Sequence, residues 1–324
     1  MLKKSLLSGF LSFWVLAGSL IPNTTFAQSY PNRPIRLIIP FAPGGGVDSA
    51  ARLIAKQMQS NLNVNIVVEN KPGANGSVGG KAVQTSPADG NTLLFSASTH
   101  VLAKQVMASP PYDPLTDFAY VARVGEAPLM MVISPDLPQT KLKEVIDAVK
   151  QQPDKWTAGL PALGAAAHLG TLTFVKQGNV NLTTVVYKGT APAFQDLIGG
   201  QISGFIDPIL GSLQYHKNGL LRVVAVTSAH RTPNLPDVPT VSETLPGYEF
   251  YSWYGLWAPV KAPQDIKDLL NAQVNKALAT DMKDKLISQG LIVGGGSIED
   301  FRKFQADDMA RSQKLITDGN IRLE

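Results

Sequence analysis

The chain has 324 residues, a net charge of +4 at pH 7 and no cysteine. The lack of cysteine excludes disulfide bonds and a lipid anchor on a cysteine. Two of the 29 basic residues, Lys3 and Lys4, stand at the start of the chain. The rest is therefore almost neutral and carries no electrostatic footprint for nucleic acid.

The first 27 residues predict an export signal rather than part of the fold. Lys3 and Lys4 precede an apolar run from about Leu6 to Ile21, and Thr25-Phe26-Ala27 offers small residues where a signal peptidase reads them. We expect cleavage after Ala27 and a mature protein that works outside the cytoplasm. A single membrane anchor is the alternative, but the run is short for a span and no basic cluster follows it.

A strand, a Pro/Gly turn and a helix come next. Leu37 to Ile39 is an apolar strand, and the helix opens near Val47 and Asp48. Between them, Gly44 to Gly46 let the backbone approach a ligand with no Cβ in the way. The unpaired N–H groups at the helix start then favour an anionic oxygen, from phosphate or carboxylate. No Gly-Lys-Ser/Thr sequence follows, which disfavours a nucleotide phosphate loop.

The rest of the chain alternates strand-like and helix-like runs, which indicates α/β architecture with mainly parallel sheets. Such sheets bind ligands beyond the carboxyl ends of their strands, here after Ile39, Phe95, Tyr187 and Ile206. The predicted strands are 64–68, 92–95, 182–187, 205–206 and 221–227, and the predicted helices are 76–85, 142–151, 193–198, 263–279, 280–289 and 297–318.

Two apolar segments flanked by Pro or Gly, residues 120–135 and 246–259, read as crossings between two lobes. We expect residues 28–126 and 251–324 to form the first lobe and residues 127–250 the second. A central insert that is crossed twice leaves a cleft that can close around a ligand. One continuous α/β sheet is the alternative, since periodicity alone does not distinguish the two.

Seven sequence blocks together identify a family resemblance. They are YPNRPIRLIIPFAPGGGVD (30–48), ENKPGANGSVGG (69–80), ADGNTLL (88–94), PYDPLTDFAYVARV (111–124), VYKGTAPAFQDLIGGQI (186–202), LRVVAVTSAHRTPNLPDVPTVSE (221–243) and PGYEFYSWYGLWAP (246–259). The chain resembles the periplasmic solute-binding proteins of tripartite tricarboxylate transporters, also called Bug proteins. The resemblance implies a two-lobed periplasmic-binding-protein ("Venus flytrap") fold. It also implies a monomer that captures a small organic carboxylate for a membrane permease, with no cofactor, no metal and no catalytic residue.

The resemblance also implies the ligand-binding residues, and ordered waters often bridge the carboxylate in such proteins. The implied ligand-binding residues fall in four groups: Phe41, Pro43, Gly44, Gly45, Gly46 and Asp48 in the first loop; Ser96, Ser98 and Thr99 in the loop after the strand that contains Phe95; Gly164, Ala165 and His168 at a glycine-rich helix start; and Tyr187, Thr190 and Asp207 at the remaining cleft edges.

The chain departs from the family pattern in GLPALGAAAHL, Gly159 to Leu169. Leu160 replaces a common serine, Ala162 a glycine, and Ala165 a residue with a hydroxyl. An apolar lining favours an apolar ligand body. We therefore predict a monocarboxylate with an apolar or aromatic body rather than a citrate-like polyanion.

Other interpretations stay open from the sequence. His100, His168 and Asp207 could meet in the cleft and hold a metal or serve a secreted hydrolase, although the chain has no Gly-x-Ser-x-Gly or His-Glu-x-x-His motif. A sensor that presents its ligand to a receptor kinase would look the same in sequence. Asp207 could instead cap a turn at Pro208, and residues 253–257 could be hinge core.

Overall fold

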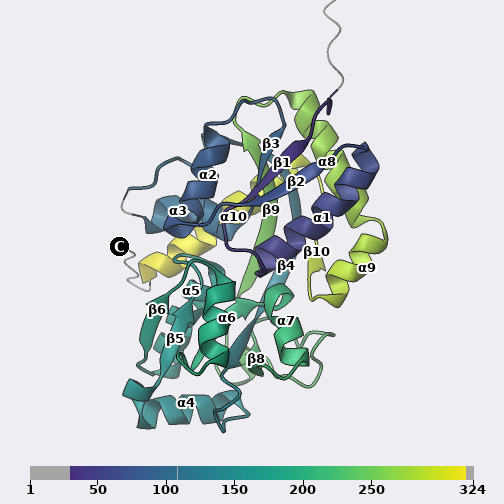
Figure 1. Cartoon of the computed structure of the whole chain (residues 1–324). Helices are drawn as coiled ribbons and strands as arrows, with labels where there is room; N and C mark the ends of the chain where they lie inside the picture. Colours follow the sequence, from purple (N-terminus) through teal and green to yellow (C-terminus); the bar gives the residue numbers. More distant parts are fainter. Residues whose placement is uncertain (1–29, 108, 319–324) are drawn as a thin grey trace, which may run out of the picture.

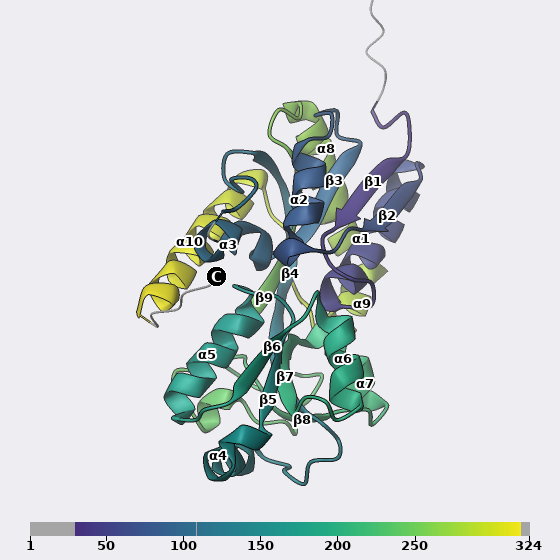
Figure 2. The ribbon, with the colours of Figure 1, turned by 60° about the vertical axis from the view of Figure 1, so that its left-hand side comes forward.

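The computed structural model describes residues 30–107 and 109–318 (Figure 1). The predicted export signal lies outside these residues. Within them, no helix combines the length and the apolar character that crossing a membrane requires. The chain forms two α/β lobes joined by a pair of long strands (Figures 1 and 2).

Lobe 1 is built on the strand order β2-β1-β3-β9-β4, with β10 added to β4. The first three strands are parallel, and β9 is antiparallel to β3 and β4. Its strands are β1 (Ile35–Ile39), β2 (Ile66–Asn70), β3 (Thr92–Ala97), β9 (Tyr251–Pro259), β10 (Ile292–Val293) and the first part of β4 (Phe118–Ile133); its helices are α1 (Gly46–Leu62), α2 (Ser77–Gln84), α3 (Ser98–Val106), α8 (Gln264–Leu278), α9 (Asp281–Ser288) and α10 (Ile298–Asp318).

Lobe 2 repeats this plan with the end of β4 between β7 and β8. The strands β7, β5 and β6 are parallel to one another, and β4 is antiparallel to them. Its own strands are β5 (Thr157–Leu160), β6 (Thr183–Val186), β7 (Gly204–Pro208) and β8 (Arg222–Val226); its helices are α4 (Leu142–Gln151), α5 (Ala166–Gly178), α6 (Thr190–Ile198) and α7 (Ile209–Lys217). Short 3-10 helices lie at Ala74–Gly76, Pro153–Lys155 and Val241–Glu243.

The strand β4 passes through both lobes without a break. Residues 118–128 pair with β9 in lobe 1, and residues 129–133 pair with β7 and β8 in lobe 2. The second crossing lies beside it, because β9 pairs with β4 from Tyr251 to Pro259. The two predicted crossings are therefore neighbouring strands of one hinge.

Apolar spacing decides which face each helix buries. In α1, Ala50, Ile54 and Met58 recur at helical spacing and are almost fully buried in the core of lobe 1. The same spacing predicts α4 with its observed bounds. The pattern does not predict α3 or α7, because each follows its strand with no glycine between them.

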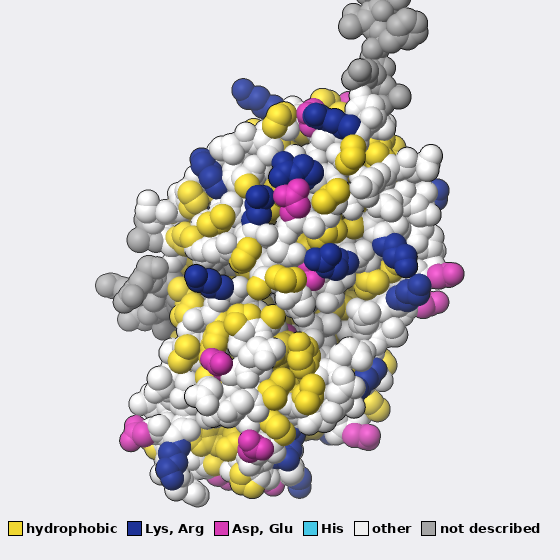
Figure 3. Space-filling model, viewed as in Figure 1, with side chains coloured by type: hydrophobic (Ala, Val, Ile, Leu, Met, Phe, Trp, Pro, Cys, Tyr) yellow, Lys and Arg dark blue, Asp and Glu magenta, His cyan; other side chains and the backbone are white. Residues whose placement is uncertain are grey.

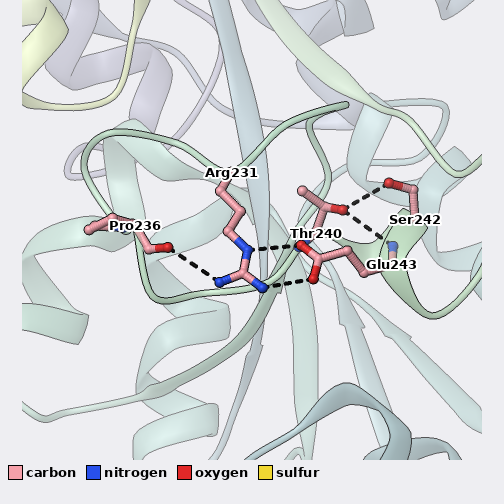
Figure 4. A network of polar contacts seen from close by, with 5 residues as sticks. All are labelled: Arg231, Pro236, Thr240, Ser242 and Glu243. Atoms are coloured by element: carbon pink, nitrogen blue, oxygen red, sulfur yellow. Dashed lines mark hydrogen bonds and ion pairs between the residues drawn. The ribbon is translucent and has the colours of Figure 1, made fainter.

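The long connection from β8 to β9 is fixed by its own polar contacts (Figure 4). The Arg231 guanidinium donates two hydrogen bonds to Glu243, at 2.9 and 2.7 Å. Glu243 also accepts from the Thr240 N–H. Together these contacts lower the pKa of Glu243 to about 2, so the carboxylate stays ionised. These contacts fold the loop back on itself before the chain returns to lobe 1.

Candidate functional site

A cavity of about 60 Å³ lies where the two lobes meet. Figure 2 shows α1 of lobe 1 above α6 and α7 of lobe 2, across the gap that the hinge strands span. Among the described residues that line the cavity there is no lysine or arginine. The lining residues are Phe41, Ala42, Gly45, Gly46, Val47, Asp48, Ala97, Thr99, Leu129, Pro161, Ala162, Ala165, Ala166, Ala167, Gly189, Thr190, Asp207, Pro208 and Ser252.

Five helix N-termini converge on this cavity. The N-cap residues of α1, α3, α5, α6 and α7 all line it, and they are Gly45, Ala97, Ala165, Gly189 and Pro208. None of them forms a side-chain cap, whereas Thr280 caps α9 in the ordinary way. Unpaired N–H groups and the positive ends of helix dipoles therefore face one small space, which favours an anion.

The lobes are in contact around the cavity. A Cβ added to Gly45 would lie 3.5 Å from the Thr190 Cβ, and one added to Gly211 would lie 2.8 Å from the Gly46 nitrogen. At the mouth, the Asn75 amide donates to the Leu163 carbonyl across the gap, at 2.7 Å. The structure therefore describes the closed arrangement of the two lobes.

Asp207 is the carboxyl group of lobe 2 that lines the cavity. It stands at the end of β7 and is fully buried. The Thr190 hydroxyl donates to Oδ1 at 2.6 Å, and the Ser212 hydroxyl donates to Oδ2 at 2.5 Å. Burial raises the pKa of Asp207 to about 7, and the two hydroxyl donors oppose this rise. The sequence leaves open whether Asp207 lies at a cleft edge or only caps the turn at Pro208. In the structure its carboxyl group lines the cavity between the lobes.

Asp48 also lines the cavity, but its hydrogen bonds are made within lobe 1. Its carboxylate accepts from the Gly44 N–H, the Arg52 guanidinium and the Asn70 amide, at 2.9 to 3.0 Å. These donors outweigh burial and lower the pKa of Asp48. Asp48 therefore fixes the glycine turn to α1 and β2.

Eight of the sequence-predicted residues line this cavity: Phe41, Gly45, Gly46, Asp48, Thr99, Ala165, Thr190 and Asp207. The other seven are not among the lining residues, namely Pro43, Gly44, Ser96, Ser98, Gly164, His168 and Tyr187. The expected loop at Ser96 to Thr99 is in fact the end of β3 and the first turn of α3.

Two of the predicted residues outside the cavity, His168 and Tyr187, make hydrogen bonds of their own. The His168 ring accepts from the Gly164 N–H at 3.0 Å, which holds the turn before α5. The Tyr187 hydroxyl donates to Asp196 at 2.7 Å, and its ring lines a neighbouring cavity of about 220 Å³ at the cleft mouth. Ser96 lies within β3 and is completely buried.

His100 belongs to a different environment. Its ring packs against Tyr112, Phe118 and Trp257, and its Nδ1 lies 3.1 Å from the Tyr112 hydroxyl. Burial lowers its pKa to about 3, so the ring is neutral. The structure does not bring His100, His168 and Asp207 together, and no cluster of three metal-binding side chains occurs in residues 30–107 and 109–318.

A larger cavity, about 490 Å³, lies between α10 and α3 of lobe 1 and α5 of lobe 2. Ser98 and Trp253 line it, together with the carboxylates of Glu126, Glu249 and Asp308 and the guanidinium of Arg311. Carboxylates outnumber the cation there, so an anion is repelled from it. Its size does not make it the candidate site.

Comparison with known proteins agrees with this geometry. A family model described as "Tripartite tricarboxylate transporter family receptor" matches residues 50–321. BugT of Bordetella pertussis is 35% identical over 302 residues, which cover 92% of this chain and 93% of BugT. The chain belongs to the tripartite tricarboxylate transporter receptor family.

Two solved receptor structures extend the comparison to the whole fold. An R. palustris protein with adipate has a TM-score of 0.88 and 33% identity, covering 90% of this chain and 99% of that one. MatC from Rhodopseudomonas palustris with bound malate has a TM-score of 0.84 and 29% identity, covering 89% and 100%. The two-lobed periplasmic-binding-protein fold is thus confirmed for this receptor.

Sequence reasoning missed several residues of the receptor's cavity. Leu129 and Ser252 come from the hinge strands β4 and β9, and Ala97, Ala166 and Ala167 come from helix starts. A usable signal exists for the last group. Helices that begin with Ala, Gly or Pro instead of Ser, Thr, Asp or Asn leave their first N–H groups free for a ligand.

Proposed function

We propose that this receptor captures a small monocarboxylate with an apolar or aromatic body in the cavity between its lobes. The convergence of five helix N-termini without side-chain caps carries this proposal. These backbone donors suit one carboxylate, held directly or through bridging waters. The ligand-binding residues would be the cavity-lining ones, with Gly45, Gly46 and Thr190 nearest the closed contact between the lobes.

The lining supports a ligand with one carboxylate rather than several. Asp207 already places one carboxyl group in the cavity, and no lysine or arginine among its described lining residues would balance a further anion. Ala162, Ala165 and Leu129 offer methyl groups to the ligand body. The related structures contain adipate and malate, which are dicarboxylates, so this receptor would differ from them in its ligand class.

The partner that we propose is the membrane permease of a tripartite tricarboxylate transporter, reached by a monomeric receptor in the periplasm. Ligand affinity coupled to lobe closure would let the permease recognise the loaded form. A sensor role, in which the closed receptor contacts a receptor kinase, needs the same binding step. Pull-down of the loaded receptor with each membrane partner separates the two roles.

A calorimetric screen tests the ligand class. We expect benzoate, phenylacetate or hexanoate to bind at least about tenfold more tightly than malate or citrate, because a second carboxylate would enter the cavity without a counterion. Tight citrate binding with no response to the monocarboxylates would contradict the proposal. Chromatography of the ligand after incubation should return it unchanged, whereas a hydrolase would convert it.

A single variant tests whether the apolar lining sets this preference. Ala162→Ser should improve malate binding relative to benzoate by roughly 2–10-fold, since one added buried hydrogen bond contributes about 0.5–1.5 kcal/mol. Ala148→Ser, on α4 and outside the cavity lining, is the matched control and should leave the ratio as it is.

A further inference from the structure

The cavity contains a buried carboxyl group before any ligand enters. Each oxygen of Asp207 accepts one hydroxyl hydrogen bond, from Thr190 or from Ser212, and the side chain is completely buried. The ionised carboxylate of Asp48 lines the same cavity, but its hydrogen bonds come from Gly44, Arg52 and Asn70 of lobe 1, and among the described residues no cation forms an ion pair with Asp207. A ligand carboxylate would therefore meet a second carboxyl group with no cation beside it.

The groups that face Asp207 come from five elements. Thr190 on α6 and Ser212 on α7 supply the hydroxyls, and Met130 of β4 is its strand partner. Gly46 opens α1 beside it, and Tyr254 of β9 is a titratable neighbour. The Tyr254 hydroxyl is buried without a hydrogen-bond partner among the described residues. Burial raises the pKa of Tyr254, and the charge of the nearby Asp207 adds a smaller rise. The phenol therefore stays neutral.

The anion position at the start of α1 is next to Asp207. A Cβ on Gly211 would lie 2.8 Å from the Gly46 nitrogen and 3.3 Å from Asp207 Oδ2, so both atoms border the same point. The Gly46 N–H is one of the first N–H groups of α1, which have no acceptor four residues earlier in the helix. A ligand carboxylate that accepted from this N–H would therefore lie close to the carboxyl of Asp207.

We propose that Asp207 takes up one proton from solvent when the ligand's carboxylate binds, and that protonated Asp207 then donates a hydrogen bond to that carboxylate. The inference rests on the proposed function, since it needs a carboxylate ligand. Two carboxylates that share a site cannot both remain ionised at low cost, and the shared proton joins them instead. Asp207 is thus a specificity residue that favours ligands with one free carboxylate over those that bring a cation.

Calorimetry with benzoate and hexanoate as probes, in two buffers of different ionisation heat, counts the protons. At about pH 8 we expect about one proton taken up per ligand bound, and at about pH 5.5 almost none. Above about pH 7 the affinity should fall by up to about tenfold per pH unit. Burial lowers the pKa of His100 to about 3 and of His168 to about 4, so neither histidine supplies this proton.

The variant Asp207→Asn keeps the shape and offers a permanent N–H donor. It should bind the probes with the wild-type affinity measured at low pH, at every pH and without proton uptake. Asp154→Asn, an exposed carboxylate of lobe 2, is the matched control and should behave as wild type. If Asp207→Asn does not fold, the proton count of the wild-type protein decides alone.

Three results would overturn the inference. One is binding of benzoate or hexanoate at about pH 8 with no proton uptake, which would leave the proposed function standing. Another is binding of 4-aminobutyrate but not of the simple acids, which would show an ionised Asp207 paired with a cation. Failure of every carboxylate probe to bind would contradict the inference and the proposed function together.

Discussion

Replacing Gly211 by alanine should weaken ligand binding roughly 5–150-fold while leaving the fold intact. The new Cβ would lie 2.8 Å from the backbone nitrogen of Gly46, and a backbone atom cannot move aside as a flexible side chain can. Overpacking of this kind costs about 1–3 kcal/mol, and here it destabilises the closed arrangement of the lobes. Gly211 does not line the cavity, but its new Cβ would also lie 3.3 Å from Asp207 Oδ2, so the loss would combine impaired closure with altered surroundings of Asp207.

The same variant should not lose stability when its lobes are apart. Alanine is favoured over glycine inside a helix by about 1 kcal/mol, so the substitution should not destabilise α7 itself. Calorimetry gives the affinity, thermal unfolding gives the stability, and small-angle scattering of the ligand-saturated variant should report a larger radius of gyration than wild type. Gly178→Ala is the matched control, because its Cβ would meet only Val180 and Phe174 at 3.6 to 3.9 Å. Binding by Gly211→Ala as tight as wild type would mean that the bound receptor does not close this contact.

Asp207→Asn should stabilise the ligand-free protein at alkaline pH relative to wild type. The pKa of Asp207 is about 7 in the folded protein and near 3.8 in the unfolded chain. Between these values the folded state holds a proton that the unfolded chain has released, so wild-type stability falls as pH rises through this window. At about pH 8 the full effect is present and amounts to roughly 2–4 kcal/mol.

Urea unfolding of both proteins at about pH 5 and about pH 8 measures this effect. The difference between the two proteins isolates Asp207, because the buried histidines with lowered pKa values, His100 and His168, are common to both. The gap should widen in favour of Asp207→Asn as the pH rises. A gap that stays constant, or that widens toward acid, would mean that Asp207 ionises at its ordinary pKa in the folded state.

Local signals account for the parts of the fold that the sequence predicts. Three glycines between an apolar strand and a helix indicate the turn at Gly44 to Gly46, and two of them border the cavity. The apolar spacing of α4 predicts its bounds, since one face alone packs on the sheet. The sequence does not predict the helix at residues 98–106. Ser98 follows Ala97 of β3 directly, and because almost every side chain in the segment is buried, no polar face marks a helical period.

Long-range packing accounts for the rest of the candidate site. Ser252 and Leu129 reach the cavity from the hinge strands, and no local pattern relates them to Gly45. His168 has the residue type of a ligand contact, yet the Gly164 N–H already occupies its Nδ1. The family resemblance indicates Thr190 and Asp207 by position. Their mutual hydrogen bond appears only once α6 and β7 are placed side by side.

The described residues that line the cavity include no lysine or arginine. This should affect both the rate of ligand association and the dependence of affinity on salt. Lys and Arg side chains and Asp and Glu side chains both occur on the face drawn in Figure 3, and no lysine or arginine among the described lining residues stands in the cavity to attract an anion. Association should then proceed at an unsteered rate, and the bound carboxylate should be held by buried dipoles that salt screens weakly. Affinity should change little between about 0.05 and 0.5 M salt. Such indifference to ionic strength suits a receptor on the outer side of the cell membrane, where the medium sets the salt concentration.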